Sequence, residues 1–173
     1  MVALIERWVR PIPDWPVPGV TFRDITPLLA EPSAFAAVVD ALAAVGRELG
    51  PVDAVLGIEA RGFIVGAPVA LALGAGFVPV RKEGKLPYET LSVSYELEYG
   101  SATVEMHADA LRPGDRVLVV DDLLATGGTL EAAAALVGQA GASVAGFVVV
   151  IELPALDGRA RVGDVPFHSL ASF

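Results

Sequence analysis

Two adjacent carboxylates, Asp121 and Asp122, directly follow a strongly apolar run. Residues 117–129 read Val-Leu-Val-Val-Asp-Asp-Leu-Leu-Ala-Thr-Gly-Gly-Thr. The β-branched run predicts a buried strand, and a parallel strand delivers its last residues to the carboxyl edge of the sheet, where α/β proteins bind ligands. The small, glycine-bearing turn after the acids lets the backbone N–H groups of residues 126–129 converge on an anion at the start of a helix. The segment therefore predicts a site for a monophosphate beside a group rich in hydroxyls.

A purely structural interpretation of the same segment is that Asp121 and Asp122 cap a turn and that Gly127 and Gly128 bend it. Adjacent carboxylates repel each other unless something uses them, which favours the functional interpretation. The segment is not an ATP-binding P-loop, because the spacing that ends in Gly-Lys-Ser or Gly-Lys-Thr is missing.

A second polar group follows another apolar run. Residues 54–58 predict a short buried strand, and Glu59, Ala60 and Arg61 come directly after it. Arginine at this position can clamp an anion with two parallel hydrogen bonds. Taken alone, the residue is equally well explained as an exposed arginine after a strand.

The charges of the chain indicate how an anion must be held. Lys and Arg number 12 against 21 Asp and Glu, which gives a formal net charge of −9. A protein that binds the nucleic-acid backbone usually carries excess positive charge, and this chain does not. An anionic ligand must therefore be bound by a local group of residues. The lysines of the chain, Lys82 and Lys85, stand together with Arg81 in one short segment, which makes it a candidate anion site.

Length and composition predict one globular domain. The chain has 173 residues, 54% of them hydrophobic, which excludes disorder and provides for a sizeable core. Two long uncharged stretches, 62–80 and 132–151, contain a proline or several glycines and predict a buried helix followed by a strand rather than a membrane span. Glu6 and Arg7 interrupt what would be the apolar part of a secretory signal. The absence of cysteine excludes disulfides and thiolate sites and fits a cytoplasmic protein.

The order of predicted elements is that of an α/β fold. Strands are expected at 54–58, 77–81, 116–120 and 143–151, and helices at 32–49 with Ser33 as a possible cap, at 62–74 and at 130–139. Strand, helix and strand in succession imply right-handed parallel crossovers. The remaining expectations are a short helix at 3–9, a proline-rich extended arm at 10–19, a polar loop at 86–94, a hairpin of 95–99 with 102–106, and an irregular tail with an edge strand near Phe167.

Several motifs together resemble one known family. The segment around Asp121 and Asp122 resembles the motif with which type I phosphoribosyltransferases bind 5-phosphoribosyl diphosphate (PRPP). Residues 18–27 (Pro-Gly-Val-Thr-Phe-Arg-Asp-Ile-Thr-Pro), 58–63, 80–87 and 95–100 (Tyr-Glu-Leu-Glu-Tyr-Gly) resemble the adenine phosphoribosyltransferases, in that family's order. The resemblance implies one domain over residues 1–173, a parallel sheet flanked by helices, a small hood from about 1–30 and a flexible lid at about 86–100.

The resemblance also implies an activity and a set of site residues. The expected reaction, a step of purine salvage, joins adenine to PRPP and gives AMP and pyrophosphate with Mg²⁺, which substrate oxygens and water would hold. Glu98 would act on the adenine proton or only orient the base, with Tyr99 beside it in the lid, and Arg61 would support catalysis. The other implied roles are ribose binding by Asp121 and Asp122; 5′-phosphate binding by Ala125, Thr126, Gly127, Gly128 and Thr129; pyrophosphate binding by Glu59, Ala60, Arg61, Arg81, Lys82 and Lys85; and adenine binding by Thr21, Phe22 and Arg23. The family further implies a homodimer and a non-proline cis peptide between Glu59 and Ala60.

Two competing functions remain at this point. One is a phosphoribosyltransferase for another purine base, such as hypoxanthine, guanine or xanthine. The other is a PRPP-sensing regulator without transferase activity, although the chain has no length to spare for a DNA-binding domain. Some of the implied roles also have structural alternatives, since Phe22 alone is more often a core residue and Glu96 with Glu98 can be a solvated strand face.

Overall fold

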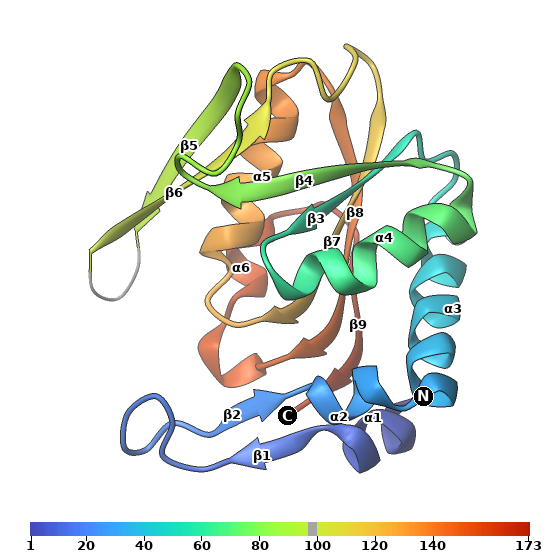
Figure 1. Ribbon diagram of the computed structural model, residues 1–173, viewed down its shortest axis with the longest axis vertical. Helices are drawn as coiled ribbons and strands as arrows, with labels where there is room; N and C mark the ends of the chain where they lie inside the picture. Colours follow the sequence, from blue (N-terminus) through green and yellow to red (C-terminus); the bar gives the residue numbers. More distant parts are fainter. Residues whose placement is uncertain (97–99) are drawn as a thin grey trace.

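A mostly parallel sheet forms the centre of the computed structural model, which describes residues 1–96 and 100–173 (Figure 1). Its strands are β3 (Ala54–Ile58), β4 (Gly76–Lys82), β5 (Thr90–Glu96), β6 (Ser101–His107), β7 (Arg116–Leu124), β8 (Ser143–Glu152) and β9 (Phe167–Ser172). Their order across the sheet is β5-β6-β4-β3-β7-β8-β9. Pairing is parallel from β4 to β9, whereas β6 is antiparallel to both of its neighbours. The predicted α/β fold class is confirmed.

Helices cover both faces of this sheet because its central strands are apolar on both sides. In β7, Leu118 and Val120 pack toward α3 (Pro32–Glu48) and α4 (Arg61–Leu73). The alternate residues Val117 and Val119 belong to the core beneath α5 (Gly128–Gln139). The three predicted helices are confirmed, with ends shifted by at most two residues.

The cap of α3 differs from the prediction. Glu31, not Ser33, is the N-cap residue, and its carboxylate accepts hydrogen bonds from the Ser33 backbone N–H at 3.4 Å and from the Ser33 hydroxyl at 2.6 Å. Pro32 occupies the first helical position, where its missing N–H costs nothing, so the N-cap residue is the one before the proline.

The N-terminal segment forms a separate small layer at one end of the sheet, next to the C-terminus (Figure 1). It comprises α1 (Val2–Trp8), β1 (Arg10–Ile12), β2 (Phe22–Asp24) and α2 (Thr26–Ala30). Part of the predicted extended arm pairs as a strand, since β1 is antiparallel to β2. Arg10 on β1 donates two hydrogen bonds to the Asp24 carboxylate on β2, at 3.1 and 2.6 Å. The backbone N–H of Thr26, together with Arg10, lowers the pKa of Asp24.

The hairpin differs from its predicted extent. The sequence predicts a loop at 86–94, but β5 begins at Thr90 and pairs with β6 from Thr90 opposite His107 to Glu96 opposite Ser101. Leu91, Val93 and Tyr95 alternate along β5 and pack against the core under α5. The serines between them make the segment look like a polar loop when composition alone is considered.

The chain after β8 returns along the sheet edge. The helical turn η1 (Pro154–Leu156) and the short α6 (Arg159–Val162) lead to β9, so the predicted edge strand near Phe167 is confirmed. None of the helices in residues 1–96 and 100–173 has both the length and the hydropathy that a membrane crossing requires.

Candidate active site

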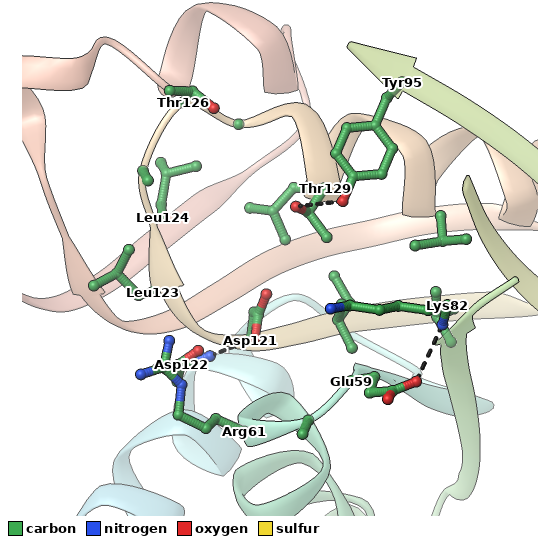
Figure 2. A pocket seen from close by; sticks show the side chains of 17 residues that line it. Glu59, Arg61, Lys82, Tyr95, Asp121, Asp122, Leu123, Leu124, Thr126 and Thr129 are labelled. Carbon is green, nitrogen blue, oxygen red and sulfur yellow. Dashed lines mark hydrogen bonds and ion pairs between the residues drawn. The ribbon is translucent and has the colours of Figure 1, made fainter. Parts of the chain in front are cut away.

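The acidic pair lies where the sequence predicts it, near the carboxyl end of a central parallel strand. Asp121 and Asp122 are on β7, which continues to Leu124 beside β8. A pocket of about 290 Å³ opens at this edge of the sheet, between the pair, the start of α4 and the loop before α5 (Figure 2). Polar residues that line it are Glu59, Arg61, Lys82, Tyr95, Asp121, Asp122, Thr126 and Thr129.

The two carboxylates are held differently although they are adjacent. The backbone N–H of Asp122 donates a 2.8 Å hydrogen bond to Oδ1 of Asp121. Asp122 is 4% exposed, and its Oδ2 lies 2.9 Å from Nε of Arg61. This contact is an ion pair without hydrogen-bond alignment, so among the described residues no group donates a well-aligned hydrogen bond to Oδ2. A buried oxygen of this kind is available to the hydroxyl of a ligand.

The local electrostatics favour a ligand that is positively charged or that donates hydrogen bonds. Burial, followed by the negative charge of Asp122, raises the pKa of Asp121 well above its usual value. Burial also raises the pKa of Asp122, and the nearby Arg61 guanidinium opposes that shift. The acidic pair thus holds negative charge at a cost, which a developing positive charge in the pocket reduces.

The connection from β3 to α4 places Arg61 against this pair. The chain leaves β3 at Ile58, passes through the predicted cis peptide between Glu59 and Ala60, and begins α4 at Arg61. The next residue is Gly62, and a Cβ atom there would lie 2.9 Å from Oδ1 of Asp121. The first turn of α4 therefore approaches β7 this closely only because residue 62 has no side chain.

The predicted phosphate loop forms the opposite wall of the pocket. Ala125, Thr126, Gly127 and Thr129 line it, and Gly127, with φ of +86°, is the N-cap residue of α5. The backbone N–H groups of the first helical turn have no carbonyl partner within the helix, which suits an anion. Gly128 instead faces β5, since a Cβ atom on it would lie 3.0 Å from Cδ2 of Tyr95.

The basic segment is only partly directed at the pocket. Lys82 lines it, and the backbone N–H of Lys82 donates to Oε2 of Glu59 at 3.1 Å (Figure 2). Arg81 is engaged elsewhere, because its Nε lies 3.3 Å from the same oxygen and its Nη1 donates to the carbonyl of Lys85 at 3.0 Å. The Lys85 side chain is exposed on the turn after β4.

The residues predicted to bind the base come from the N-terminal layer. Phe22 on β2 is half-buried rather than part of the core, and the guanidinium carbon of Arg61 lies 5.1 Å from its ring centroid. The Trp15 ring meets Phe22 edge to face at 4.5 Å. Thr21 is exposed, and the Arg23 guanidinium stacks 4.7 Å from the ring of Phe173. Phe22 is thus brought next to the pocket, through its contact with Arg61.

Two predicted residues and one unpredicted residue complete the description. Glu98 and Tyr99 lie outside the described residues, so their roles remain predictions. Tyr95 was not singled out from the sequence, although it lines the pocket and its hydroxyl accepts a 3.3 Å hydrogen bond from Oγ1 of Thr129. The period-2 alternation of Leu91, Val93 and Tyr95 is the sequence signal that points to it.

Comparisons with known proteins agree with this site. Residues 26–168 match the model of the phosphoribosyl transferase domain. Adenine phosphoribosyltransferase from Acidothermus cellulolyticus is 65% identical over 167 residues, which are 96% of this chain and 94% of the relative. The enzyme of that name from Thermobifida fusca is 60% identical over 171 residues, with coverage of 98% and 96%.

Solved structures give the same result. Adenine phosphoribosyltransferase from Thermoanaerobacter pseudethanolicus superimposes with a TM-score of 0.94 at 46% identity and covers 100% of both chains. The enzyme from Saccharomyces cerevisiae, solved with adenine and an imino-altritol bisphosphate, has a TM-score of 0.92 at 38% identity, with coverage of 97% and 98%. The sequence matches over nearly the whole chain, the fold and the paired acids beside the phosphate loop all lead to one conclusion. The chain belongs to the phosphoribosyl transferase family and, within it, to the adenine phosphoribosyltransferases.

Proposed function

We propose that this protein transfers the 5-phosphoribosyl group from PRPP to adenine and releases AMP and pyrophosphate. In this reaction a ring nitrogen of adenine forms a bond to the anomeric carbon and loses its proton, while the bond from that carbon to the pyrophosphate oxygen breaks. The observation that carries the proposal is the juxtaposition of Asp121 and Asp122 with the loop before α5 at one sheet edge. The identity of 65% to an adenine phosphoribosyltransferase supports adenine as the base.

The acidic pair and the phosphate loop are assigned the ribose 5-phosphate part of PRPP. The carboxylates of Asp121 and Asp122 accept hydrogen bonds from the 2′- and 3′-hydroxyls, for which the unaligned Oδ2 of Asp122 has capacity. Residues 125–129 hold the 5′-phosphate through backbone N–H groups, a mode suited to a chain of net charge −9. As the leaving group departs, the sugar ring gains positive charge, which the nearby carboxylates stabilise.

The opposite side of the pocket is assigned the pyrophosphate. Arg61 supplies a planar guanidinium that can hold two oxygens at once, and Lys82 supplies a second positive charge. Glu59 and Ala60 shape the turn before Arg61, and Arg81 contributes less directly because it is paired with Glu59. Lys85, whose side chain is exposed after β4, is assigned a supporting role by the resemblance.

Adenine is assigned to the side of the pocket next to the N-terminal layer. Phe22 offers an aromatic face for stacking, and the backbone groups of Thr21 and Arg23 can read the edge of the base. The segment at 86–100 serves as a lid that excludes water from the activated anomeric carbon, and residues 1–30 serve as the hood. Glu98, with Tyr99 beside it, then either accepts the adenine proton or orients the base.

The donor groups around the pocket fit Mg²⁺ bound through the substrate. No cluster of three or more metal-ligating side chains occurs in residues 1–96 and 100–173, whereas the buried Oδ2 of Asp122 retains accepting capacity. An ion that keeps several waters and binds phosphate oxygens suits such a site. Bound in this way, Mg²⁺ would neutralise charge on the pyrophosphate leaving group. Asp121 and Asp122 would orient the hydroxyls and waters around it.

A homodimer and a cytoplasmic location are also proposed. Leu71 on α4 is 83% exposed and Ile64 on the same helix is 45% exposed, which is unusual for large apolar side chains and suits a surface covered by a second copy. In such a dimer the basic segment that contains Lys82 and Lys85 could also serve the neighbouring pocket. The lack of cysteine fits a reducing compartment. Light scattering during gel filtration should give twice the chain mass of 17.9 kDa.

A competition between bases tests the proposed function. The enzyme is given PRPP, Mg²⁺ and equal concentrations of adenine, hypoxanthine, guanine and xanthine, and the nucleotide products are separated by chromatography. AMP is the expected main product. A different nucleotide would identify a transferase for another base, and PRPP binding without any nucleotide would identify a PRPP-sensing regulator.

A further inference from the structure

An ionic network lies outside the pocket, at the end of β8, and joins a buried carboxylate to a more exposed arginine. Glu152 is 5% exposed, and its carboxylate accepts hydrogen bonds from Nε and Nη2 of Arg159, the latter at 2.7 Å, and from the hydroxyl of Ser169 at 2.9 Å. The Arg159 guanidinium also lies 4.5 Å from the ring centroid of Phe167. The hydrogen bonds from Arg159 lower the pKa of Glu152, so the pair remains charged. The proposed function assigns no role to this network.

The network holds the segment around Gly158, which packs directly against the phosphate loop. Gly158, the residue before Arg159, approaches the loop so closely that a Cβ atom on it would clash with the carbonyl oxygen of Ala125 and lie 2.8 Å from Cδ1 of Leu124. In the reverse direction, a Cβ atom on Gly127 would clash with the carbonyl oxygen of Gly158. The backbones of the two segments are therefore in direct contact.

The same network is also joined to the strand that leads into the loop. Glu152 is paired with Leu124 in the parallel register of β7 and β8, and the backbone N–H of Leu153 donates to the carbonyl of Leu124 at 3.0 Å. Leu124 is the last residue of β7, immediately before Ala125. Glu152 is therefore anchored to the start of the phosphate loop through the sheet and to Gly158 through Arg159.

We propose that Glu152 and Arg159 are positioning residues that set the backbone of residues 125–129 for the 5′-phosphate. The loop lacks a basic side chain, so it must bind through N–H groups whose directions are fixed in advance. The ion pair holds Gly158 against Gly127 and Ala125 and so prevents the loop from relaxing away from the ligand. This inference rests on the proposed function, because it assumes that the loop receives the phosphate of PRPP.

Titration calorimetry with ribose 5-phosphate tests this role directly. Arg159→Met retains much of the side-chain volume but loses the two hydrogen bonds, and it should raise the Kd for ribose 5-phosphate by about tenfold to a hundredfold. The KM for PRPP should rise in parallel, while the KM for adenine changes by less than about twofold. Arg159→Lys, which keeps the charge, should recover part of the loss.

Arg116→Met is the matched control. Arg116 lies at the start of β7 and donates to the carbonyls of Pro51 and Leu49 at 3.0 Å, at the opposite edge of the sheet. Its loss should lower the Tm without changing the Kd for ribose 5-phosphate. An unchanged Kd in Arg159→Met, or an equal rise in Kd in Arg116→Met, overturns the proposal, since the ion pair would then act only on stability.

Gly158→Ala keeps the proposal testable if the arginine variants do not fold. The added methyl group pushes directly on Ala125 and Leu124 while the ion pair remains, so the same selective loss of ribose 5-phosphate binding is expected. A folded Gly158→Ala protein with normal binding contradicts the proposal. Wild-type enzyme that binds ribose 5-phosphate but forms no AMP would refute the proposed function and leave the positioning role standing.

Discussion

Arg61 lies between Asp122 and Phe22, with its Nε 2.9 Å from the carboxylate and its guanidinium carbon 5.1 Å from the aromatic centroid. One side chain thus contacts both the group assigned to ribose and the group assigned to adenine. For PRPP to bind as proposed, Arg61 must turn from Asp122 toward the pyrophosphate, which exposes the carboxylate and the aromatic face together.

Arg61→Lys should therefore impair PRPP use although the charge is kept. An ammonium group cannot hold two pyrophosphate oxygens in one plane, and we expect kcat/KM for PRPP to fall by about a hundredfold. Steady-state kinetics with adenine held saturating measures this value. Arg47→Lys is the control, because Arg47 donates one hydrogen bond to the Ala72 carbonyl, at the end of α4 away from the pocket. Equal kinetics for Arg61→Lys and the control would exclude a clamp.

Asp121→Asn should make the substrate-free protein more stable at neutral pH. The folded protein raises the pKa of Asp121 above the ordinary value of 3.8, so the free energy of unfolding falls as the pH rises from about 3.8 through the raised pKa. The neutral amide avoids this loss and still accepts the hydrogen bond from the backbone N–H of Asp122. Thermal melts across pH should show a gain in Tm over wild type that shrinks toward acid pH. A variant less stable than wild type at neutral pH would be incompatible with a raised pKa.

Gly127→Ala and Gly128→Ala should fail in different ways. Gly127 has φ of +86° and touches Gly158, so alanine there should cost about 1–3 kcal/mol of the free energy of unfolding. A methyl group at Gly128 would meet Tyr95 at 3.0 Å and not enter the pocket directly. Because Tyr95 lines the pocket and contacts Thr129 of the phosphate loop, its displacement should weaken PRPP binding more than adenine binding while stability is preserved. Urea unfolding and the two KM values separate these effects. Equal loss of both substrates in Gly128→Ala would mean that this glycine serves only the fold.

Glu98→Gln tests the remaining catalytic assignment. If Glu98 accepts the adenine proton, kcat should fall by about 10²- to 10⁴-fold with little change in the KM for adenine. If it only orients the base, the KM should rise or kcat fall by less than about tenfold, which is roughly 1.4 kcal/mol. A pre-steady-state burst of AMP that survives in the variant would locate the defect in product release rather than in chemistry. Normal kcat would remove Glu98 from the catalytic residues.

The sequence predicts those parts of the site whose residues are adjacent in the chain. Asp121, Asp122 and the loop before α5 form one continuous segment, so strand, acids and phosphate turn are recognised together. The alternation of apolar strands and helices likewise predicts the parallel sheet, because each element is strongly apolar. The resemblance to a known family then supplied the roles of residues near Arg61 and Phe22.

The unpredicted features depend on how the chain turns and on how its strands pair. The pairing of Glu152 with Arg159 requires the chain to turn back through η1, and no local pattern specifies that turn. The sequence does not predict the start of β5 at Thr90, because Ser92 and Ser94 occupy the polar face of the strand and resemble loop residues. The redirection of Arg81 toward Glu59, rather than into the pocket, follows from the register of β3 against β4.

The most direct measurement compares AMP formation from adenine, PRPP and Mg²⁺ by the wild-type enzyme and by the Asp121→Asn, Asp122→Asn double variant. Wild-type enzyme should convert adenine to AMP with one pyrophosphate per AMP, and the folded variant should be slower by at least about 10²-fold, because the amides cannot stabilise a positively charged ribose. Asp115→Asn, at the opposite end of β7, should retain full activity. The absence of AMP with wild-type enzyme, or undiminished AMP formation by the double variant, would contradict the proposed function and the role of the acidic pair, respectively.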